Sequence, residues 1–556
     1  MPRRLIRDFR GFVPQLYTTL SRGYGARDLR ADLVAGLTVA IVALPLAMAL
    51  AIASGTTPER GLHTAIVAGF LISALGGSRV QIGGPTAAFI PVVFNVIERF
   101  GYEGLILCTL LAGLILIAAG LLRLGVLLRY MPQPVITGFT AGIAVSIFAS
   151  QVKDALGLRM DQVPGEFFER WAAYFAHLPS WQPAAAALCA TGLIALALLK
   201  RHRPGWPAFL IVVVAGSLAA LALPVPTIGS TFGQLPAALP EFAIPSIPFE
   251  RTLELLPAAL TIAFLAGVES LLSAVVADGM TGQRHRSNAE LVAQGVANAA
   301  SALVAGLPAT GALARTATNI RAGARSPIAG MAHAGFLLAF MLVLAPLMGY
   351  VPLAVLAALL LVVAWNMAEI HRFKQLLRAP VGDRVVLLVT FALTVAFDLT
   401  IAIEVGVVLA AFVFMHRMST SVSVAPVEDG DAEDEPDARQ RLPEGVEMFR
   451  FSGPLFFAVA NRLDQVLDPI REPPKVFILR LRQVPLIDAS GVTALEEFVS
   501  RCEKMGTAVI LSGLHGQPHT ILHQMDFGRH PNLLGLAAGF DEALAMAKAA
   551  LKIEAA

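Results

Sequence analysis

Fourteen apolar runs, each long enough to cross or half-cross a bilayer, follow one another through residues 33–415. With 56% hydrophobic and only 15% charged residues, the 556-residue chain is too apolar for a soluble protein of its size. We therefore expect a polytopic α-helical membrane protein with fourteen spans. The runs are 33–53, 62–75, 86–97, 105–122, 135–150, 184–199, 208–223, 255–276, 291–304, 313–320, 328–348, 353–365, 385–397 and 401–415.

The third and tenth runs are short, and each follows a Gly/Pro interruption, Gly83–Pro85 in one case and Gly306–Pro308 in the other. They hold corresponding places in two sets of seven runs, a pattern that marks the substrate site of inverted-repeat transporters. A helix that begins inside the membrane leaves unpaired N–H groups and a positive dipole end. Such backbone must lie against protein or a polar cavity. Two such ends facing each other predict an anion site.

Basic residues are unevenly distributed between the loops, and they predict the orientation. The first 32 residues, which we interpret as a cytoplasmic N-terminal segment without a signal peptide, hold seven arginines. The positive-inside rule then places both termini in the cytoplasm. We expect the membrane to be a bacterial inner membrane. The predicted inner loops hold Arg123, Arg129, Lys200, Arg201, Arg203, Arg284, Arg286, Arg321, Arg325, Arg372, Lys374 and Arg378.

The chain changes character after residue 418, where the predicted transmembrane domain, 33–418, ends. Residues 419–442 are acidic and interrupted by proline, as is typical of a linker. Residues 443–556 then predict a small cytoplasmic α/β domain. Its expected strands are 446–451, 476–481 and 509–511, and its expected helices are 459–468, 491–504, 517–525 and 540–552.

Glu269 lies near the middle of the eighth run, where an ionisable group is costly and indicates function. A buried carboxyl favours its neutral form, so Glu269 is a candidate for loading and releasing a proton. Ser273 follows on the same helix face and is expected to hydrogen-bond Glu269 or to help line a cation site. The structural alternative is a Glu269 that only pairs with a neighbouring helix.

Arg315 lies in the short tenth run, and guanidinium groups bind oxyanions well. The alternative is an arginine that extends to the cytoplasmic surface. Thr86, Ala87 and Phe89 open the third run: small residues admit a substrate to the backbone, and Phe89 can wall the pocket. Close helix packing would also explain the small residues.

Asp488 and Ser490 stand where a strand leads into a helix, and both are placed to cap that helix. The alternative is phosphorylation or nucleotide contact at this loop. The three cysteines are far apart, and no metal-ligand spacing or nucleophile–base pattern occurs. We expect no metal, cofactor or nucleic-acid partner, and no enzyme.

Seven short motifs are spread over both parts of the chain: Asp32–Thr38, Leu44–Ala49, Gly83–Thr86, Gly306–Pro308, Ala314–Thr316, Ala322–Ser326 and Asp488–Gly491. In these motifs the chain resembles SulP-type anion permeases with a C-terminal STAS domain. The resemblance implies a seven-plus-seven inverted repeat with core and gate domains, elevator-like transport and a homodimer to which the STAS domain contributes. It also implies a substrate site between the third and tenth half-helices, and a cytoplasmic partner for STAS. The implied substrate site comprises Thr86, Ala87, Phe89, Gly311, Ala312 and Arg315.

At two positions this chain differs from the sodium-dependent members of the family that it resembles. These members tend to carry Asp where this chain has Glu269, and a hydroxyl residue near Leu313, whose side chain offers no oxygen. Proton coupling is therefore favoured over sodium coupling. Ala489 stands where phosphorylated STAS domains often have a hydroxyl residue, which weakens a switch at Ser490.

We therefore expect a proton-coupled secondary transporter of a small anion such as sulfate, bicarbonate or a dicarboxylate. The alternatives are an uncoupled exchanger or channel of the same family and a sodium-coupled bicarbonate symporter. A nucleobase permease or a ligand sensor with STAS as its output is a more distant alternative.

Overall fold

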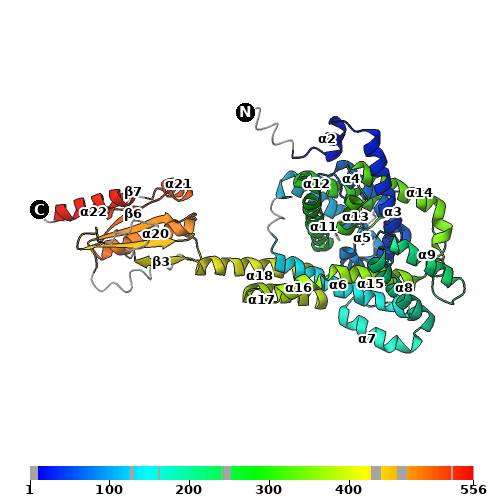
Figure 1. The fold of residues 1–556 in the computed structure, drawn as a ribbon. Coiled ribbons are helices and arrows are strands. Elements are labelled where there is room, and N and C mark those ends of the chain that lie inside the picture. Colours follow the sequence, from blue (N-terminus) through cyan, green and yellow to red (C-terminus); the bar gives the residue numbers. More distant parts are fainter. Residues whose placement is uncertain are drawn as a thin grey trace. The chain divides into compact units, whose positions relative to one another are not determined.

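The computed structural model forms two compact units, Met1–Ala410 and Ala411–Ala556, whose elements are labelled in Figure 1. The first unit is a polytopic helical bundle and the second contains a β-sheet, which confirms the predicted fold class. The structure describes residues 11–125, 131–160, 163–203, 205–238, 242, 252–397, 399–426, 440–459, 473–527 and 530–554.

The helices of the first half follow the predicted runs. The third and fourth runs share the label α5 but are separated by a break at Gly101, whose φ of 72° and ψ of −177° are not helical. Glycine adopts this backbone conformation without strain. The helices are α2 (Gln15–Ser21), α3 (Ala26–Ala53), α4 (Pro58–Leu75), the short 3₁₀ helix η1 (Ala87–Phe89), α5 (Ile90–Leu121), α6 (Gln133–Leu156), α7 (Phe167–His177), η3 (Leu178–Ser180), α8 (Pro183–His202), α9 (Ala208–Ala220) and α10 (Ile228–Phe232).

In the second half, too, each predicted run coincides with a helix. Over the whole described chain, eight helices are long and apolar enough to span a membrane. The second-half helices are α11 (Thr252–Thr281), α12 (Ser287–Leu303), α13 (Leu313–Arg321), α14 (Ile328–Met348), α15 (Leu353–Met367), α16 (Ile370–Leu376), α17 (Val381–Ala396) and α18 (Leu399–Thr420).

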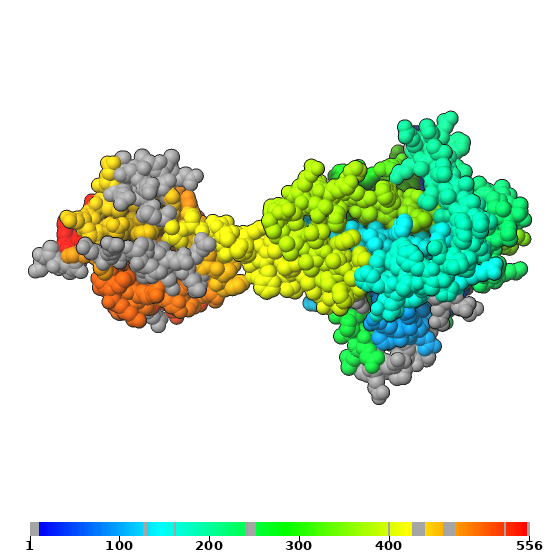
Figure 2. Space-filling view, turned by 90° about the horizontal axis from the view of Figure 1, so that it is seen from below, coloured from blue at the N-terminus to red at the C-terminus, as the bar shows by residue number. Residues whose placement is uncertain are grey.

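The helices of the first unit pack in two groups. In the first group, which we call the core, α3, α4, α5, α11, α12, α13 and α14 contact one another. In the second, which we call the gate, α6, α8, α9, α15 and α17 do so. Figure 2 shows gate segments, cyan to teal and yellow-green, side by side on one face. Within the core, α5 and α12 cross where a Cβ on Gly113 would lie 2.7 Å from the Gly295 carbonyl oxygen.

A two-stranded antiparallel sheet joins the two Gly/Pro interruptions. Strand β1 (Gly83–Gly84) pairs with β2 (Thr310–Gly311), and Gly83 lies opposite Gly311. Segments more than two hundred residues apart are thus hydrogen-bonded immediately before the two half-helices that follow them. This antiparallel pairing agrees with two halves of opposite orientation.

The second unit contains a five-stranded sheet in the order β3-β4-β5-β6-β7. Strand β3 is antiparallel to β4, and the remaining neighbours are parallel. Helix α20 covers one face and α22 the other, because successive residues such as Phe477 and Ile478 point to opposite faces. The elements are β3 (Ser423–Pro426), β4 (Val446–Ser452), β5 (Val476–Gln483), α20 (Ala489–Lys504), β6 (Ala508–Ser512), α21 (Gln517–Gln524), β7 (Leu533–Ala537) and α22 (Phe540–Glu554).

Two strands of this sheet differ from the sequence prediction. Strand β3 falls inside the predicted linker 419–442, where helix α18 also ends, and β7 was not expected. The predicted helix 459–468 lies outside the described residues, apart from residue 459.

Candidate functional site

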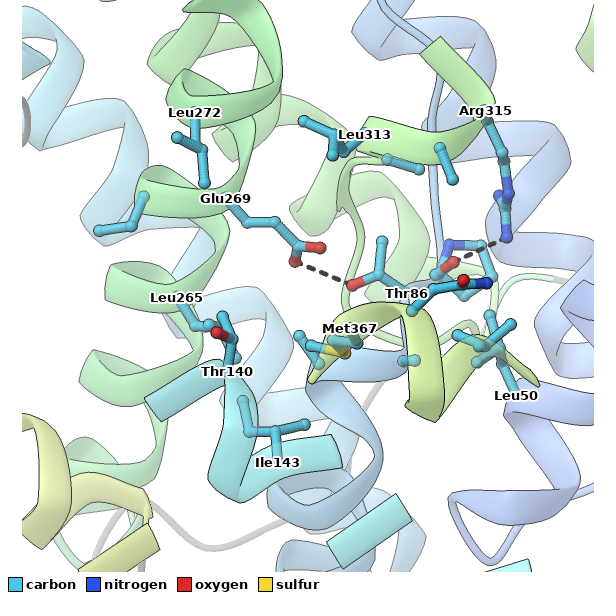
Figure 3. Close-up of a pocket in the computed structure, with 18 of the residues that line it drawn as sticks. Leu50, Thr86, Thr140, Ile143, Leu265, Glu269, Leu272, Leu313, Arg315 and Met367 are labelled. Atoms are coloured by element: carbon cyan, nitrogen blue, oxygen red, sulfur yellow. Dashed lines mark hydrogen bonds between the residues drawn. The ribbon is translucent and has the colours of Figure 1, made fainter. Parts of the chain in front are cut away.

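A cavity of about 380 Å³ lies between the core and the gate (Figure 3). Core residues from α3, α11 and α13 line it, together with the segment around η1. Gate residues from α6, α9 and α15 line the opposite side, together with Ile403 of α18. Most of this lining is apolar, so the few polar groups decide what the cavity can bind.

Glu269 projects into this cavity from α11. The Thr86 hydroxyl donates a hydrogen bond of 3.0 Å to Glu269 Oε2 (Figure 3). Thr86 immediately precedes η1, so this bond joins the eighth predicted span to the start of the third. Glu269 thus pairs with a neighbouring segment, as the structural alternative also predicts, and its place in the cavity wall is what supports the functional hypothesis.

Arg315 approaches the same cavity from α13 and is only 4% exposed. Its Nη2 donates to the Pro85 carbonyl oxygen at 2.9 Å (Figure 3). Among the described residues, its Nη1 atom has no hydrogen-bond partner. The burial contradicts the alternative in which Arg315 extends to the membrane surface. Among the described residues, the N–H groups of Arg315 Nη1 therefore have no hydrogen-bond acceptor beside the cavity.

Two helix N-termini also point at the cavity. Thr86 precedes η1 and Ala312 precedes α13, and neither residue caps its helix with a side-chain hydrogen bond. The first N–H groups of each helix therefore lack intrahelical partners, and each end carries a partial positive charge. Together with Arg315 they make this wall of the cavity electropositive.

A network of small polar side chains holds the interruptions in place. Gln81 Nε2 donates to the Ser270 carbonyl oxygen at 3.1 Å. The Ser270 hydroxyl lies 2.6 Å from the Thr310 hydroxyl and accepts from the Gly311 N–H at 3.0 Å. Sequence reasoning found Gly311 but not Gln81, Ser270 or Thr310, although a serine next to Glu269 inside an apolar span was a usable signal.

The structure brings most of the predicted site residues together. Thr86, Ala87, Ala312, Arg315 and Glu269 line one cavity.

Three predicted residues lie elsewhere. Phe89 is 2% exposed and packs in the hydrophobic core, and Gly311 lies in β2, where it pairs with Gly83. Ser273 donates to the Thr316 hydroxyl at 3.3 Å and not to Glu269. The expected hydrogen bond from Ser273 to Glu269 is therefore wrong, because α13 packs against α11 and supplies the partner.

In the second unit, Asp488 is the N-cap of α20. Its Oδ1 accepts from the Gly491 N–H at 2.8 Å, and its Oδ2 accepts from the Phe457 N–H at 3.2 Å. Ser490 lies in the first turn of α20 and is exposed, so capping falls to Asp488 alone. Across the described part of both units, no cluster of three or more His, Cys, Asp or Glu side chains is arranged to hold a metal ion.

Comparison with known proteins agrees with this architecture. Residues 29–390 match the model of the sulfate permease family, and residues 438–538 match the STAS domain. The protein YvdB of Bacillus subtilis is 41% identical over 507 residues, which cover 90% of this chain and 95% of that one. The bicarbonate transporter BicA of Synechocystis is 31% identical over 519 residues, with 90% and 91% covered.

The fold of the murine anion transporter Slc26a9 in its inward-facing state superposes with a TM-score of 0.87 at 20% identity, over 98% of this chain and 95% of that one. At that identity the likeness concerns the fold. The family match and the two sequence relatives together show that this chain belongs to the sulfate permease family of anion transporters and carries a C-terminal STAS domain.

Proposed function

We propose that this protein is a secondary active transporter that carries a small oxyanion together with a proton. The proposal rests on one observation: Glu269, hydrogen-bonded to Thr86, shares a cavity with the buried Arg315. Sulfate, bicarbonate and small dicarboxylates are the candidate substrates, because the family is named for sulfate and BicA for bicarbonate.

The charges of the cavity explain why an anion and a proton would load together. When Glu269 is ionised, its negative charge offsets the positive charge of Arg315, and the wall offers little attraction to a second anion. When Glu269 is protonated, Arg315 and the two helix ends remain, and an anion replaces the lost negative charge. Coupling therefore follows from charge balance in a poorly solvated site.

The same balance favours movement of the loaded site. A monovalent anion such as bicarbonate, paired with Arg315 beside a neutral Glu269, places less net charge in the low-dielectric membrane than either ion alone. We propose that the core, which holds both residues, moves against the gate in an elevator-like manner. We further propose a homodimer in a bacterial inner membrane, with both termini cytoplasmic.

The experiment is uptake into proteoliposomes of labelled sulfate, bicarbonate and fumarate, with and without an inward proton gradient. We expect the gradient to accelerate one of these anions in the wild type. Glu269→Gln mimics the protonated carboxyl, so we expect anion exchange to persist while the response to the gradient disappears. Glu254→Gln, an exposed residue at the start of the same helix, is the matched control.

A Glu269→Gln protein with a full gradient response would remove the proton-carrying role. Wild-type uptake that depends on an opposing anion or on voltage, and not on protons, would favour an exchanger or channel. Stimulation by sodium alone would favour sodium symport.

A further inference from the structure

A second and larger cavity, of about 1070 Å³, lies on gate helices and on the neighbouring short helix α16. Its walls come from α6, α8, α15, α16 and α17, which lie on one side of the first unit (Figure 1). We call this cavity the gate groove. It shares only Asn366 with the cavity that holds Glu269.

The gate groove has a floor of small side chains and walls of large exposed ones. Ala141, Ala144 and Ala364 are buried at its base. Phe148 and Trp365 stand at its sides and are 51% and 71% exposed. The alanines leave space that the neighbouring side chains do not fill, and the aromatic rings border it with apolar surface.

The depth of the gate groove suits a lipid chain. On α8 the lining extends from Leu193 to Arg201, a rise of about 12 Å at 1.5 Å per residue. One leaflet of hydrocarbon is roughly 15 Å thick. The apolar part therefore reaches most of the way through one leaflet from the end at which Arg201 lies.

Three basic side chains line that end: Lys200, Arg201 and Lys374. Lys200 donates to Asn366 Oδ1 at 3.3 Å. For Arg201 and Lys374, the described part of the chain offers no carboxylate partner, whereas neighbouring Arg372 is paired with Glu369 at 3.5 Å. The positive-inside rule places this end at the cytoplasmic surface, where anionic headgroups and interfacial tryptophans are found.

We propose that the gate groove is a binding site for an anionic phospholipid. The phosphate lies against Arg201 and Lys374, and an acyl chain follows the alanine floor toward Phe148. Any lipid covers apolar surface equally well, so the unpaired basic groups are what select the headgroup charge. A protein segment of neutral or basic chemistry would leave these two charges unmatched.

The test uses native mass spectrometry of the purified full-length protein after delipidation. The probes are dioleoyl phosphatidylglycerol and dioleoyl phosphatidylcholine, which have the same acyl chains. We expect the wild type to retain phosphatidylglycerol preferentially. Arg201→Gln with Lys374→Gln should reduce that preference about thirtyfold, since each basic residue near the surface contributes about 1 kcal/mol. Arg22→Gln with Arg27→Gln removes two exposed charges from the N-terminal segment and should change nothing.

A second variant tests the apolar part independently. Ala197 is exposed on α8 and lines the gate groove, so Ala197→Trp fills it without entering the packed interior. We expect retention of both lipids to fall. Equal retention of the two lipids by the wild type, or unchanged selectivity in the double glutamine variant, would overturn the proposal. A change in oligomeric state in Ala197→Trp, with lipid retention unaltered, would assign the groove to a second copy of the chain.

Discussion

At the scale of single residues, the Thr86 hydroxyl connects the start of η1 to the proposed proton site. Thr86→Val keeps the shape of the side chain but removes the donor to Glu269 Oε2. A hydrogen bond to a charged group contributes about 1.5–3 kcal/mol. We therefore expect gradient-driven uptake to fall by roughly tenfold to a hundredfold in proteoliposomes.

Thr86→Ser is the control for this prediction, because it keeps a hydroxyl at the same position and should retain most of the uptake. If Thr86→Val transports as well as Thr86→Ser, the hydrogen bond has no part in the transport cycle.

The charged residues of the site could be predicted from the sequence because a charge inside an apolar span is costly and therefore conspicuous. This argument found Glu269 and Arg315. The partner of Ser273 could not be predicted in the same way. Helix spacing places Ser273 on the Glu269 face, but which helix packs there depends on the tertiary structure, and Thr316 of α13 accepts its hydrogen bond.

At the scale of elements, the β1–β2 pair fixes where both half-helices begin. A Cβ on Gly311 would lie 1.5 Å from Gln81 Nε2, the atom that donates to the Ser270 carbonyl oxygen. Gly311→Ala must therefore displace Gln81 and disturb the strand pairing. We expect a destabilisation of about 1–3 kcal/mol, seen as a lower melting temperature in detergent, and a loss of uptake at matched expression.

Gly279→Ala is the matched control, since a Cβ at Gly279 in α11 meets no atom within 4 Å. Alanine also favours the helix, so this variant should be neutral or slightly stabilising. A Gly311→Ala protein that melts and transports like Gly279→Ala would show that the β1–β2 pair tolerates strain.

The membrane helices could be predicted from the sequence because each one coincides with a long run of apolar residues. Every predicted apolar run coincides with a helix, and the break that separates the third run from the fourth falls at Gly101, where the backbone is not helical. Strands β3 and β7 lack such a signal. The first is four residues long and ends in Pro426, and the second contains Gly535 with φ 155°; both features disfavour strand in isolation.

At the scale of the whole molecule, transport by an elevator requires the core to move past the gate. The cavity supplies a direct test, since Leu265 of α11 and Thr140 of α6 line it from the two domains (Figure 3). The three native cysteines are buried, so introduced thiols can be modified selectively. A short bifunctional thiol reagent can then join the core to the gate.

We expect Leu265→Cys with Thr140→Cys to lose uptake when the reagent forms the link, and to regain it when a reductant cleaves a disulfide-containing linker. Leu50→Cys with Leu265→Cys is the control, because α3 and α11 both belong to the core and move together. We expect uptake by this control variant to change little when the link forms, although the same reagent is then bound in the cavity. Full uptake by the linked core–gate pair would mean that the anion passes without relative movement of the two domains. Loss in both pairs would mean that the reagent merely blocks the cavity.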